Sequence, residues 1–409
     1  MRMTRRELMS GGLKGCTLLA SGLSVPRFLS RSALALDGPQ TDARILVVLQ
    51  LTGGNDGLNT FIPYQDDAYY RARPVLAVPR GQVLRLTDDC GVHPQMQGIK
   101  DLFDAGWVSV VQGVGYPNPN RSHFESMDLW HTCCTEPKAR DGTGWLGRAA
   151  QRLGDAGAAL PAVHVDSAEV PLALGTSGVA VPSLHHPDEF RLDAGGEGGK
   201  LDALRAIVSA SPSRATDDLL FVQRTTLTAC DQAERIAQAA RQGASGASYP
   251  GYGLGEHLRL IANLISANLG ARIYYTSLSG FDTHAKQRNH HPQLLAQIGQ
   301  SLKAFFDDLA ARKLADRVLV LTFSEFGRRV HENYSEGTDH GAAAPMMLVG
   351  PGVAPGVHGA APNLTDLDDG DVRMQLDFRA VYASVLQNWL QVDPSAVLGR
   401  SYPLARILR

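Results

Sequence analysis

Short apolar runs recur along the chain, and each one ends in a loop rich in glycine or polar residues. Four of these runs cover residues 45–49, 107–114, 272–278 and 317–323, and a fifth covers 346–349. Runs that are apolar at nearly every position are typical of strands buried on both faces of a parallel sheet. We therefore predict a central, mostly parallel β-sheet.

Between these runs lie segments in which apolar residues recur three or four positions apart, as in an amphipathic helix. They cover residues 94–105, 256–268, 292–313 and 378–390. Strands that alternate with helices indicate an α/β fold, a three-layer αβα sandwich around the mostly parallel sheet.

Residues 154–250 break this alternation. We interpret the block as an insertion or cap on the main sheet, within one α/β domain that covers residues 36–409. Its features are two short strand-like pieces, a loop rich in glycine and aspartate, a long polar helix and a linker, at residues 162–165, 172–174, 193–199, 216–242 and 245–248.

The N-terminus has the three parts of a secretory signal. Arg5 and Arg6 form a charged pair, residues 11–26 are weakly apolar, and Ala33-Leu34-Ala35 matches a signal-peptidase site. Paired arginines in this layout are the address read by the twin-arginine translocase, which exports folded proteins. We predict a signal peptide over residues 1–35 and a periplasmic or secreted protein.

Charge and hydropathy exclude two classes of partner. The formal net charge is −2 and the sequence pI is about 6.7, so no basic surface indicates binding to nucleic acid. No apolar run of about 18 residues follows the signal, so we expect no stable membrane insertion of the mature chain. Four cysteines remain after the signal, and their number permits a disulfide between Cys90 and either Cys133 or Cys134, with Cys230 as the fourth.

Polar side chains follow the predicted strands where each strand ends. In open α/β sheets, ligands bind at the carboxyl ends of the strands, so these loops predict one site. Carboxylates and imidazoles that converge there suit a divalent metal, and the mixture does not distinguish zinc, calcium, magnesium and manganese or one ion from two. The candidates are Asn55, Asp56, Ser122, His123, Asp282, His284, Glu325, Asp339 and His340.

Several of these residues also fit structural roles. Asp56 and Ser122 each stand where a side chain caps a helix. Glu325 fits a buried ion pair with Arg328 or Arg329 as well as a metal, whereas Arg328 also fits the bidentate binding of an anionic substrate. We expect a loop or cap role for His93 and solvated positions for His290, His291 and His331.

Five sequence blocks, in this order behind a twin-arginine signal, resemble a known exported family, catalogued as domain of unknown function 1501. The blocks are LTGGNDGLNT, YPNPNRSHF, GFDTH, TFSEFGR and GTDHG. That family is placed in the alkaline phosphatase and sulfatase superfamily, so the resemblance implies an alkaline-phosphatase-like fold. Better-known members use two metals and a Ser, Thr or formylglycine nucleophile to cleave phosphate or sulfate esters.

The resemblance also implies roles for single residues. Asp56 resembles the superfamily's first-strand ligand of the second metal, and Ser122 resembles the nucleophile at a helix N-terminus. Asp282, His284 and His340 resemble ligands of the first metal. Glu325 takes the place of an aspartate in the superfamily's Ser-Asp-His-Gly block.

Three departures from the superfamily pattern bear on these roles. Asp282 and His284 are two positions apart, where four is usual, and Phe326 replaces a histidine of the second metal. The spacing from Asp56 to Ser122 is longer than usual, which leaves His123 or Thr60 as alternative functional groups.

The leading hypothesis is an exported metal-dependent hydrolase of phosphate or sulfate esters, acting on a small-molecule or glycan ester. Ser122 attacks, with His123 and Arg328 as further catalytic candidates. The alternative is a non-catalytic exported binding protein that keeps the fold with a degenerate metal site. A serine α/β-hydrolase is not supported, because the chain has no G-x-S-x-G elbow.

Overall fold

Each of the five apolar runs forms a strand of one central sheet in the computed structural model of the protein. The structure describes residues 43–158, 160–179, 181–184 and 247–409. The predicted signal peptide, loop 193–199, helix 216–242, residues 245 and 246 of the linker, and Cys230 lie outside the described residues. The five strands are β1 (Ile45–Thr52), β5 (Val108–Gly115), β8 (Ile273–Ser279), β9 (Val318–Phe323) and β10 (Ala344–Val349).

The central sheet has nine strands in the order β11-β5-β10-β9-β1-β8-β6-β7, with β12 also beside β5. Every pairing is parallel except those of β10, which runs antiparallel to β9 and β5. The start of β10 therefore lies at the edge where β1, β5, β8 and β9 end. The added strands are β6 (Ala162–Val165), β7 (Ser183–Leu184), β11 (Gly356–His358) and β12 (Leu376–Asp377).

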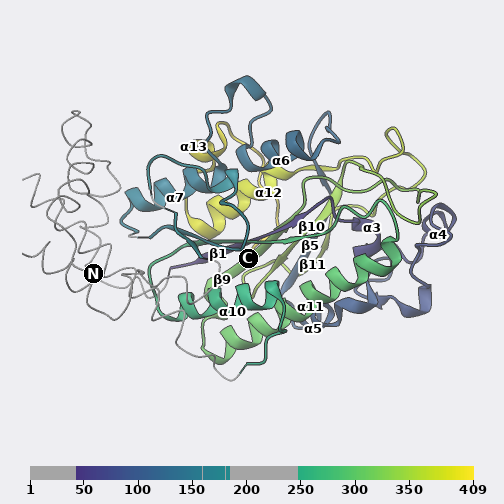
Figure 1. Ribbon diagram of the computed structural model, residues 1–409, viewed down its shortest axis with the longest axis horizontal. Coiled ribbons are helices and arrows are strands. Elements are labelled where there is room, and N and C mark those ends of the chain that lie inside the picture. The colour runs from purple at the N-terminus through teal and green to yellow at the C-terminus, as the bar shows by residue number, and fades with distance from the viewer. Residues whose placement is uncertain (1–42, 159, 180, 185–246) are drawn as a thin grey trace, which may run out of the picture.

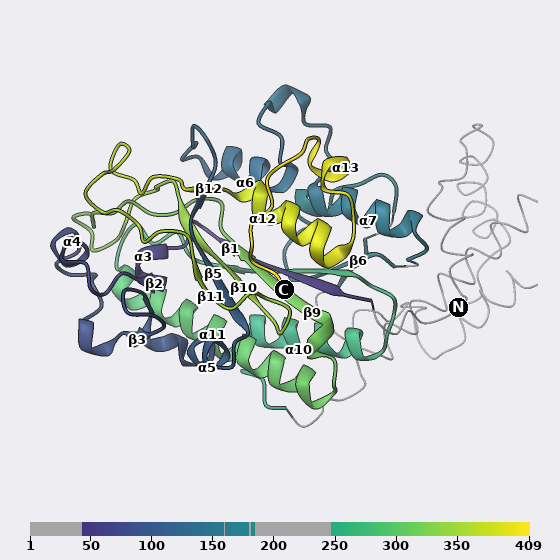
Figure 2. The same cartoon turned by 180° about the vertical axis from the view of Figure 1, so that it is seen from behind.

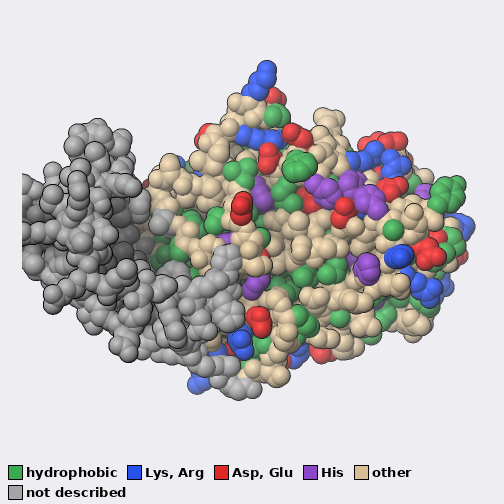
Figure 3. Space-filling view, viewed as in Figure 1, with side chains coloured by type: hydrophobic (Ala, Val, Ile, Leu, Met, Phe, Trp, Pro, Cys, Tyr) green, Lys and Arg blue, Asp and Glu red, His purple; other side chains and the backbone are tan. Residues whose placement is uncertain are grey.

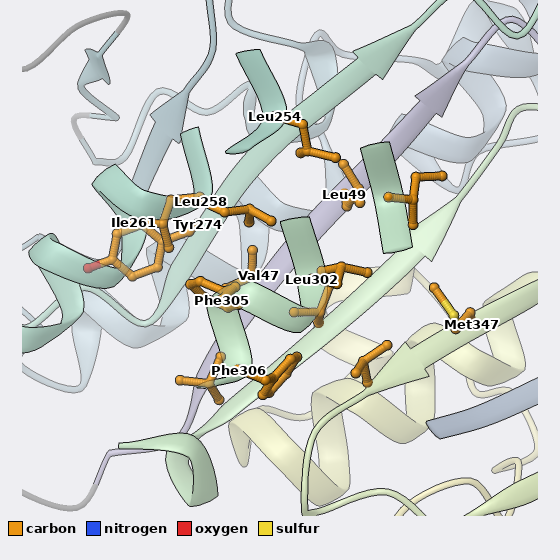
Figure 4. Close-up of a cluster of buried hydrophobic side chains, with 14 of the residues drawn as sticks. Val47, Leu49, Leu254, Leu258, Ile261, Tyr274, Leu302, Phe305, Phe306 and Met347 are labelled. Carbon is orange, nitrogen blue, oxygen red and sulfur yellow. The ribbon is translucent and has the colours of Figure 1, made fainter. Parts of the chain in front are cut away.

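Helices cover both faces of this sheet (Figures 1 and 2), which confirms the predicted three-layer αβα sandwich. Alternate residues of β1 show why: Val47 and Leu49 belong to the core on one face, and Leu46 and Val48 to the core on the other. Figure 4 shows the first core, in which Leu302 and Phe305 pack beside β1.

The layer over this first core contains α5 (Gln97–Asp104), α10 (Gly253–Ser266) and α11 (Gln287–Ala311). The opposite layer contains α6 (His123–Thr132), α7 (Trp145–Asp155), α12 (Phe378–Ser384) and α13 (Pro394–Leu398). A π-helix, Val385–Leu390, continues α12.

A small sheet and two short helices stand beside the carboxyl edge of the central sheet. The strands β2 (Phe61–Ile62), β3 (Leu84–Arg85) and β4 (Gly91–Val92) pair in the order β2-β4-β3. The helices are α3 (Gly57–Thr60) and α4 (Asp67–Ala72), and both contribute to a separate apolar cluster. Short 3₁₀ turns lie at Arg80–Gln82, Pro94–Met96, Pro137–Ala139, Leu172–Leu174 and Ala315–Arg317.

Three element predictions differ from the structure. Residues 172–174 form a 3₁₀ turn instead of a strand, because the Leu174 and Gly175 N–H groups bond three residues back. Strands β6 and β7, at the beginning of the 154–250 block that we interpret as an insertion or cap on the sheet, belong to the sheet itself. Helix α11 starts before Pro292, because its first N–H groups bond to carbonyls of the 331–339 loop.

The disulfide that the number of cysteines permits between Cys90 and Cys133 or Cys134 is not formed, because these three cysteines are free thiols. The physical reason is the sheet itself, because Cys90 belongs to the core on one face and Cys133 to the core on the other. Within the described ranges, no helix combines the length and apolar character needed to cross a membrane.

Candidate metal centre

The carboxyl edge of the sheet brings together most of the side chains proposed for the site. His123 is the first residue of α6, after β5. Asp282 and His284 follow β8, and His340 precedes the antiparallel β10. Figure 3 shows a broad group of histidine side chains on this face of the molecule, beside the region of α6.

Each of the three site histidines uses its Nδ1 atom for a hydrogen bond to an oxygen acceptor. His123 Nδ1 lies 2.8 Å from Glu325 Oε1, His284 Nδ1 lies 3.1 Å from Asp339 Oδ1, and His340 Nδ1 lies 2.8 Å from the Arg121 carbonyl oxygen. These oxygens only accept, so each Nδ1 carries the proton. Each neutral ring therefore presents an unprotonated Nε2 atom.

Two of these Nε2 atoms meet at one oxygen of Asp282. His284 Nε2 and His340 Nε2 lie 3.0 and 3.2 Å from Asp282 Oδ1, and 2.8 Å from each other. Three electron-rich atoms this close repel one another unless a metal ion, or a proton on one of the rings, lies among them. The separations are near the roughly 3.3 Å between neighbouring ligand atoms of a tetrahedral zinc site with 2.0–2.1 Å bonds.

His123 completes the group from the other side of Asp282. Its Nε2 atom lies 3.5 Å from Asp282 Oδ2, and His123, Asp282 and His340 can all offer ligand atoms to one ion. The two imidazoles and one carboxylate of this group, with His284 beside it, suit zinc and other first-row transition metals better than calcium or magnesium, which prefer oxygen ligands. The residues present therefore fit a divalent transition metal.

The pKa shifts of Asp282 and His340 favour metal binding, whereas the shift of His123 favours its protonated ring. Partial burial acts to raise the pKa of Asp282, but the hydrogen bond from Arg328 and the nearby His340 outweigh it and lower the pKa to about 2. Burial lowers the pKa of His340 more than its hydrogen bonds raise it, which favours the neutral ring that metals require. A hydrogen bond to Glu325 raises the pKa of His123.

Phe326 closes the space beside the histidines. It is buried, and its ring centroid lies 4.9 Å from that of His123 and 4.5 Å from that of His340. The position where the superfamily pattern has a further metal-binding histidine is thus filled by an apolar ring.

Asp56 does not join the group, contrary to its proposed role as a ligand of a second metal. It caps α3, and its Oδ2 atom accepts hydrogen bonds from Arg73 and Gln287, both at 2.5 Å. The Arg73 and Asp56 side chains are fully buried. Burial acts to raise the pKa of Asp56, but Arg73 outweighs it and the pKa is lowered. The structural role as cap and ion-pair partner is the one observed.

Arg328 is also occupied inside the protein, so the structure does not offer it to an anionic substrate. Its buried guanidinium donates to the carbonyl oxygens of Gly54, Thr338, Gly53 and Phe281 and, at 2.7 Å, to Asp282 Oδ1. These hydrogen bonds link the loops after β1 and β8 to the segment before β10 that contains Thr338. Arg328 is therefore a positioning residue for Asp282.

Glu325 and Asp339 lie behind the histidines instead of facing Asp282 directly. Glu325 is buried, but its partners are His123 and the Gly53 N–H group, 2.8 Å away, instead of the predicted Arg328 or Arg329. Carboxylates that bond a histidine from behind orient the ring and raise its basicity as a ligand.

The nucleophile candidates differ in accessibility. Ser122 is exposed at the N-cap of α6, and its hydroxyl makes no capping hydrogen bond. Thr60 is buried, and its hydroxyl bonds to the Asp56 carbonyl at 2.8 Å and to Asn55 Oδ1 at 3.1 Å. Ser122 is therefore the accessible hydroxyl of the two.

The sequence did not predict the roles of two residues, Arg121 and His291. Arg121 acts through its backbone carbonyl, which no sequence pattern reveals, although the residue lies in the YPNPNRSHF block. His291, expected in solvent, is buried and bonds to Asn55 Oδ1 at 2.9 Å. The other expectations agree with the structure, since His93 caps a 3₁₀ turn and His290 and His331 are exposed.

Three solved structures illustrate what the fold is similar to. A protein of the alkaline phosphatase superfamily from Vibrio parahaemolyticus has 10% identity and a TM-score of 0.39, covering 93% of this chain and 79% of its own. The PsFucS1 sulfatase from Pseudoalteromonas sp. has 10% identity and a TM-score of 0.37, covering 84% and 70%. The alkaline phosphatase of the Antarctic bacterium TAB5 has 12% identity and a TM-score of 0.32, covering 76% and 92%.

A search of curated proteins found no match. The assignment of residues consequently depends on the geometry described above. The family model described as "Protein of unknown function (DUF1501)" matches residues 43–399, which is most of the chain and includes every residue of the metal centre. The chain belongs to this family.

Proposed function

We propose that this protein is an exported hydrolase of phosphate or sulfate esters that depends on one divalent metal ion. Asp282, His284 and His340 would hold the ion, with His123 as a further ligand. The observation that carries the proposal is the convergence of unprotonated Nε2 atoms on Asp282, with each Nδ1 fixed by an oxygen acceptor. A divalent ion bound there supplies Lewis-acid polarisation of a phosphoryl or sulfuryl oxygen.

Ser122 is the proposed nucleophile. It stands at the N-terminus of α6, where free N–H groups and the helix dipole stabilise an anionic ester group. Attack by its oxygen would form a Ser122 ester and release the substrate's alcohol, which takes up a proton. Water would then hydrolyse the Ser122 ester and restore the hydroxyl.

Hydrolysis of 4-nitrophenyl phosphate and 4-nitrophenyl sulfate by the exported protein tests this proposal. We expect turnover of at least one ester with added zinc or manganese, and its loss in Ser122→Ala and in His340→Ala. Because Ser122 is exposed and its hydroxyl makes no cap, Ser122→Ala should fold normally. Metal-loaded wild-type protein that cleaves neither ester, or Ser122→Ala with full activity, would contradict the proposal.

One observation favours the second candidate, a binding protein that retains the fold. Phe326 fills a position of the superfamily's second metal, and Arg328 is used within the protein. The two candidates differ in outcome, because the binding protein would take up one metal ion without cleaving any ester.

A further inference from the structure

Two aromatic side chains near the metal centre are exposed far beyond what a folded core explains. Phe124 is 85% exposed, and Tyr334 is fully exposed. The other large apolar side chains described as exposed are each less than half exposed: Val75, Val170, Met374 and Leu404. Large apolar rings left in water commonly mark a surface that binds something.

The three site histidines form a row whose two ends adjoin these aromatic residues. His340 is in the middle, with ring centroids 4.5 Å from His123 and 4.6 Å from His284. Phe124 follows His123 directly in α6. Tyr334 follows Asn333, whose side-chain amide donates to the His284 carbonyl and to Asp339 Oδ1, both at 3.0 Å. One aromatic residue therefore belongs to each end of the row.

Hydrogen bonds hold both aromatic positions in fixed segments. On one side, the Ser126 N–H group bonds to the Ser122 carbonyl in the first turn of α6. On the other, the Lys286 and Gln287 N–H groups bond to the Ser335 and Glu336 carbonyls. A backbone held in this way loses little conformational freedom when a ligand stacks on the aromatic side chain that it carries.

We propose that Phe124 and Tyr334 are stacking platforms for sugar rings on either side of the metal centre. The inference rests on the proposed function and names its substrate class: an oligosaccharide whose phosphate or sulfate ester lies on an internal ring. A sugar ring offers an apolar face to an aromatic ring and hydroxyl groups to water. A substrate that contacts both ends of the row must extend in both directions from its ester, which a small monoester does not.

The polar row between the aromatic residues argues against a protein partner. Protein interfaces have a continuous apolar centre with a polar rim, whereas here histidine and aspartate side chains separate the two rings. Self-association of the protein through Phe124 and Tyr334 is one of the outcomes that would overturn the proposal.

The proposal can be tested by probing an array of sulfated, phosphorylated and neutral oligosaccharides with the wild-type protein. Calorimetry then measures the affinity for the oligosaccharide that binds most strongly. We expect Phe124→Ala and Tyr334→Ala each to weaken binding by about 2- to 12-fold, from the 0.5–1.5 kcal/mol typical of one aromatic stacking contact. Leu404→Ala is the matched control, an exposed apolar residue in the C-terminal segment, and should bind like the wild type.

The inference is overturned if the wild-type protein binds no oligosaccharide on the array. It is equally overturned if Phe124→Ala and Tyr334→Ala bind like the wild type. It is also overturned if the variants alter only the KM for 4-nitrophenyl esters, which identifies an aryl site, or only self-association. Saccharide binding that depends on Phe124 and Tyr334 without hydrolysis of any ester supports the platforms while refuting the hydrolase. The failures of the two proposals are thus distinguishable.

Discussion

At the scale of single residues, the hydrogen bond at Nδ1 of each histidine determines whether its Nε2 atom can bind a metal. An imidazole that donates from Nδ1 leaves Nε2 free for a metal, and the acceptor behind it fixes the orientation of the ring. The three acceptors come from different parts of the chain: Glu325, Asp339 and the Arg121 carbonyl. Their agreement is strong support for a metal centre, because no single structural role requires all three.

Asp339→Asn tests the role of such an acceptor. The side chain is more than half exposed, so the substitution should leave the fold intact while weakening the hydrogen bond that orients His284. We expect the zinc affinity, measured by competition with a chelator, to fall about 10- to 100-fold. The matched control is Asp366→Asn, another exposed aspartate, which should not change the affinity.

Asp56→Asn separates the structural carboxylate from the metal centre. It leaves the buried Arg73 without its charged partner, so the free energy of unfolding should fall by about 3–5 kcal/mol at pH 7. Urea unfolding measures this change. An unaltered free energy of unfolding, or a zinc content that falls in a fully folded variant, would restore Asp56 as a candidate ligand.

The same carboxylate gives a dependence on pH. The pKa of Asp56 is lowered in the folded protein from its ordinary value of 3.8, so its stabilising contribution is complete above that value. The contribution is lost as the pH falls through 3.8 toward the folded-state pKa, where protonation breaks the pair with Arg73. The difference in unfolding free energy between wild type and Asp56→Asn should therefore shrink between pH 5 and about pH 3. A constant difference would count against the ion pair.

At the scale of elements, the single antiparallel strand explains how the site is assembled. Because β10 runs against its neighbours, the residues before it lie at the same edge as the residues after β5, β8 and β9. Backbone pairing between Arg328 and His340 then fixes the segment that carries His340. The long connection over residues 324–343, between β9 and β10, therefore brings His340 back to the edge where Asp282 lies.

Gly53→Ala tests the contact between the loops after β1 and β8. Gly53 has a φ of +119°, and an added Cβ would lie 2.4 Å from the Asp282 backbone nitrogen. We expect a loss of about 1–3 kcal/mol in unfolding free energy from backbone strain, together with weaker zinc binding because Asp282 is displaced.

Gly270→Ala is the matched control for this substitution. Gly270 has a φ of +81°, but nothing lies near its added Cβ. The two substitutions therefore share the backbone strain of a positive φ, and only Gly53→Ala adds a steric clash. A Gly53→Ala protein that loses stability but binds zinc as tightly as Gly270→Ala would show that this contact does not position Asp282.

The strands and the edge that carries the site could be predicted from sequence, because buried parallel strands are apolar at nearly every position. The partners of the buried charged side chains could not be predicted from the sequence. The position of Asp56 after the first strand predicts a metal ligand, and nothing in the sequence pattern reveals its partner Arg73, at the end of α4. Likewise, Arg328 was assigned to a substrate, although four backbone carbonyls accept its N–H groups, and carbonyl directions depend on tertiary structure.

At the scale of the whole molecule, the proposed function includes export through the twin-arginine route. The paired arginines of the N-terminus provide a direct test of that export. Replacing both Arg5 and Arg6 by lysine should leave the protein uncleaved and cytoplasmic, because the translocase reads the arginine pair. Cell fractionation with immunoblotting checks this outcome, and a periplasmic, cleaved variant would refute the twin-arginine route.

The metal content of the purified protein decides whether the centre described here exists. After incubation with zinc and removal of loosely bound ions, elemental analysis should find about one ion per chain in the wild type. His284→Ala and His340→Ala should retain almost none, whereas His331→Ala, which changes an exposed histidine outside the centre, should retain it. Wild-type protein without bound metal, or equal metal in all three variants, would contradict the assignment of Asp282, His284 and His340 as ligands.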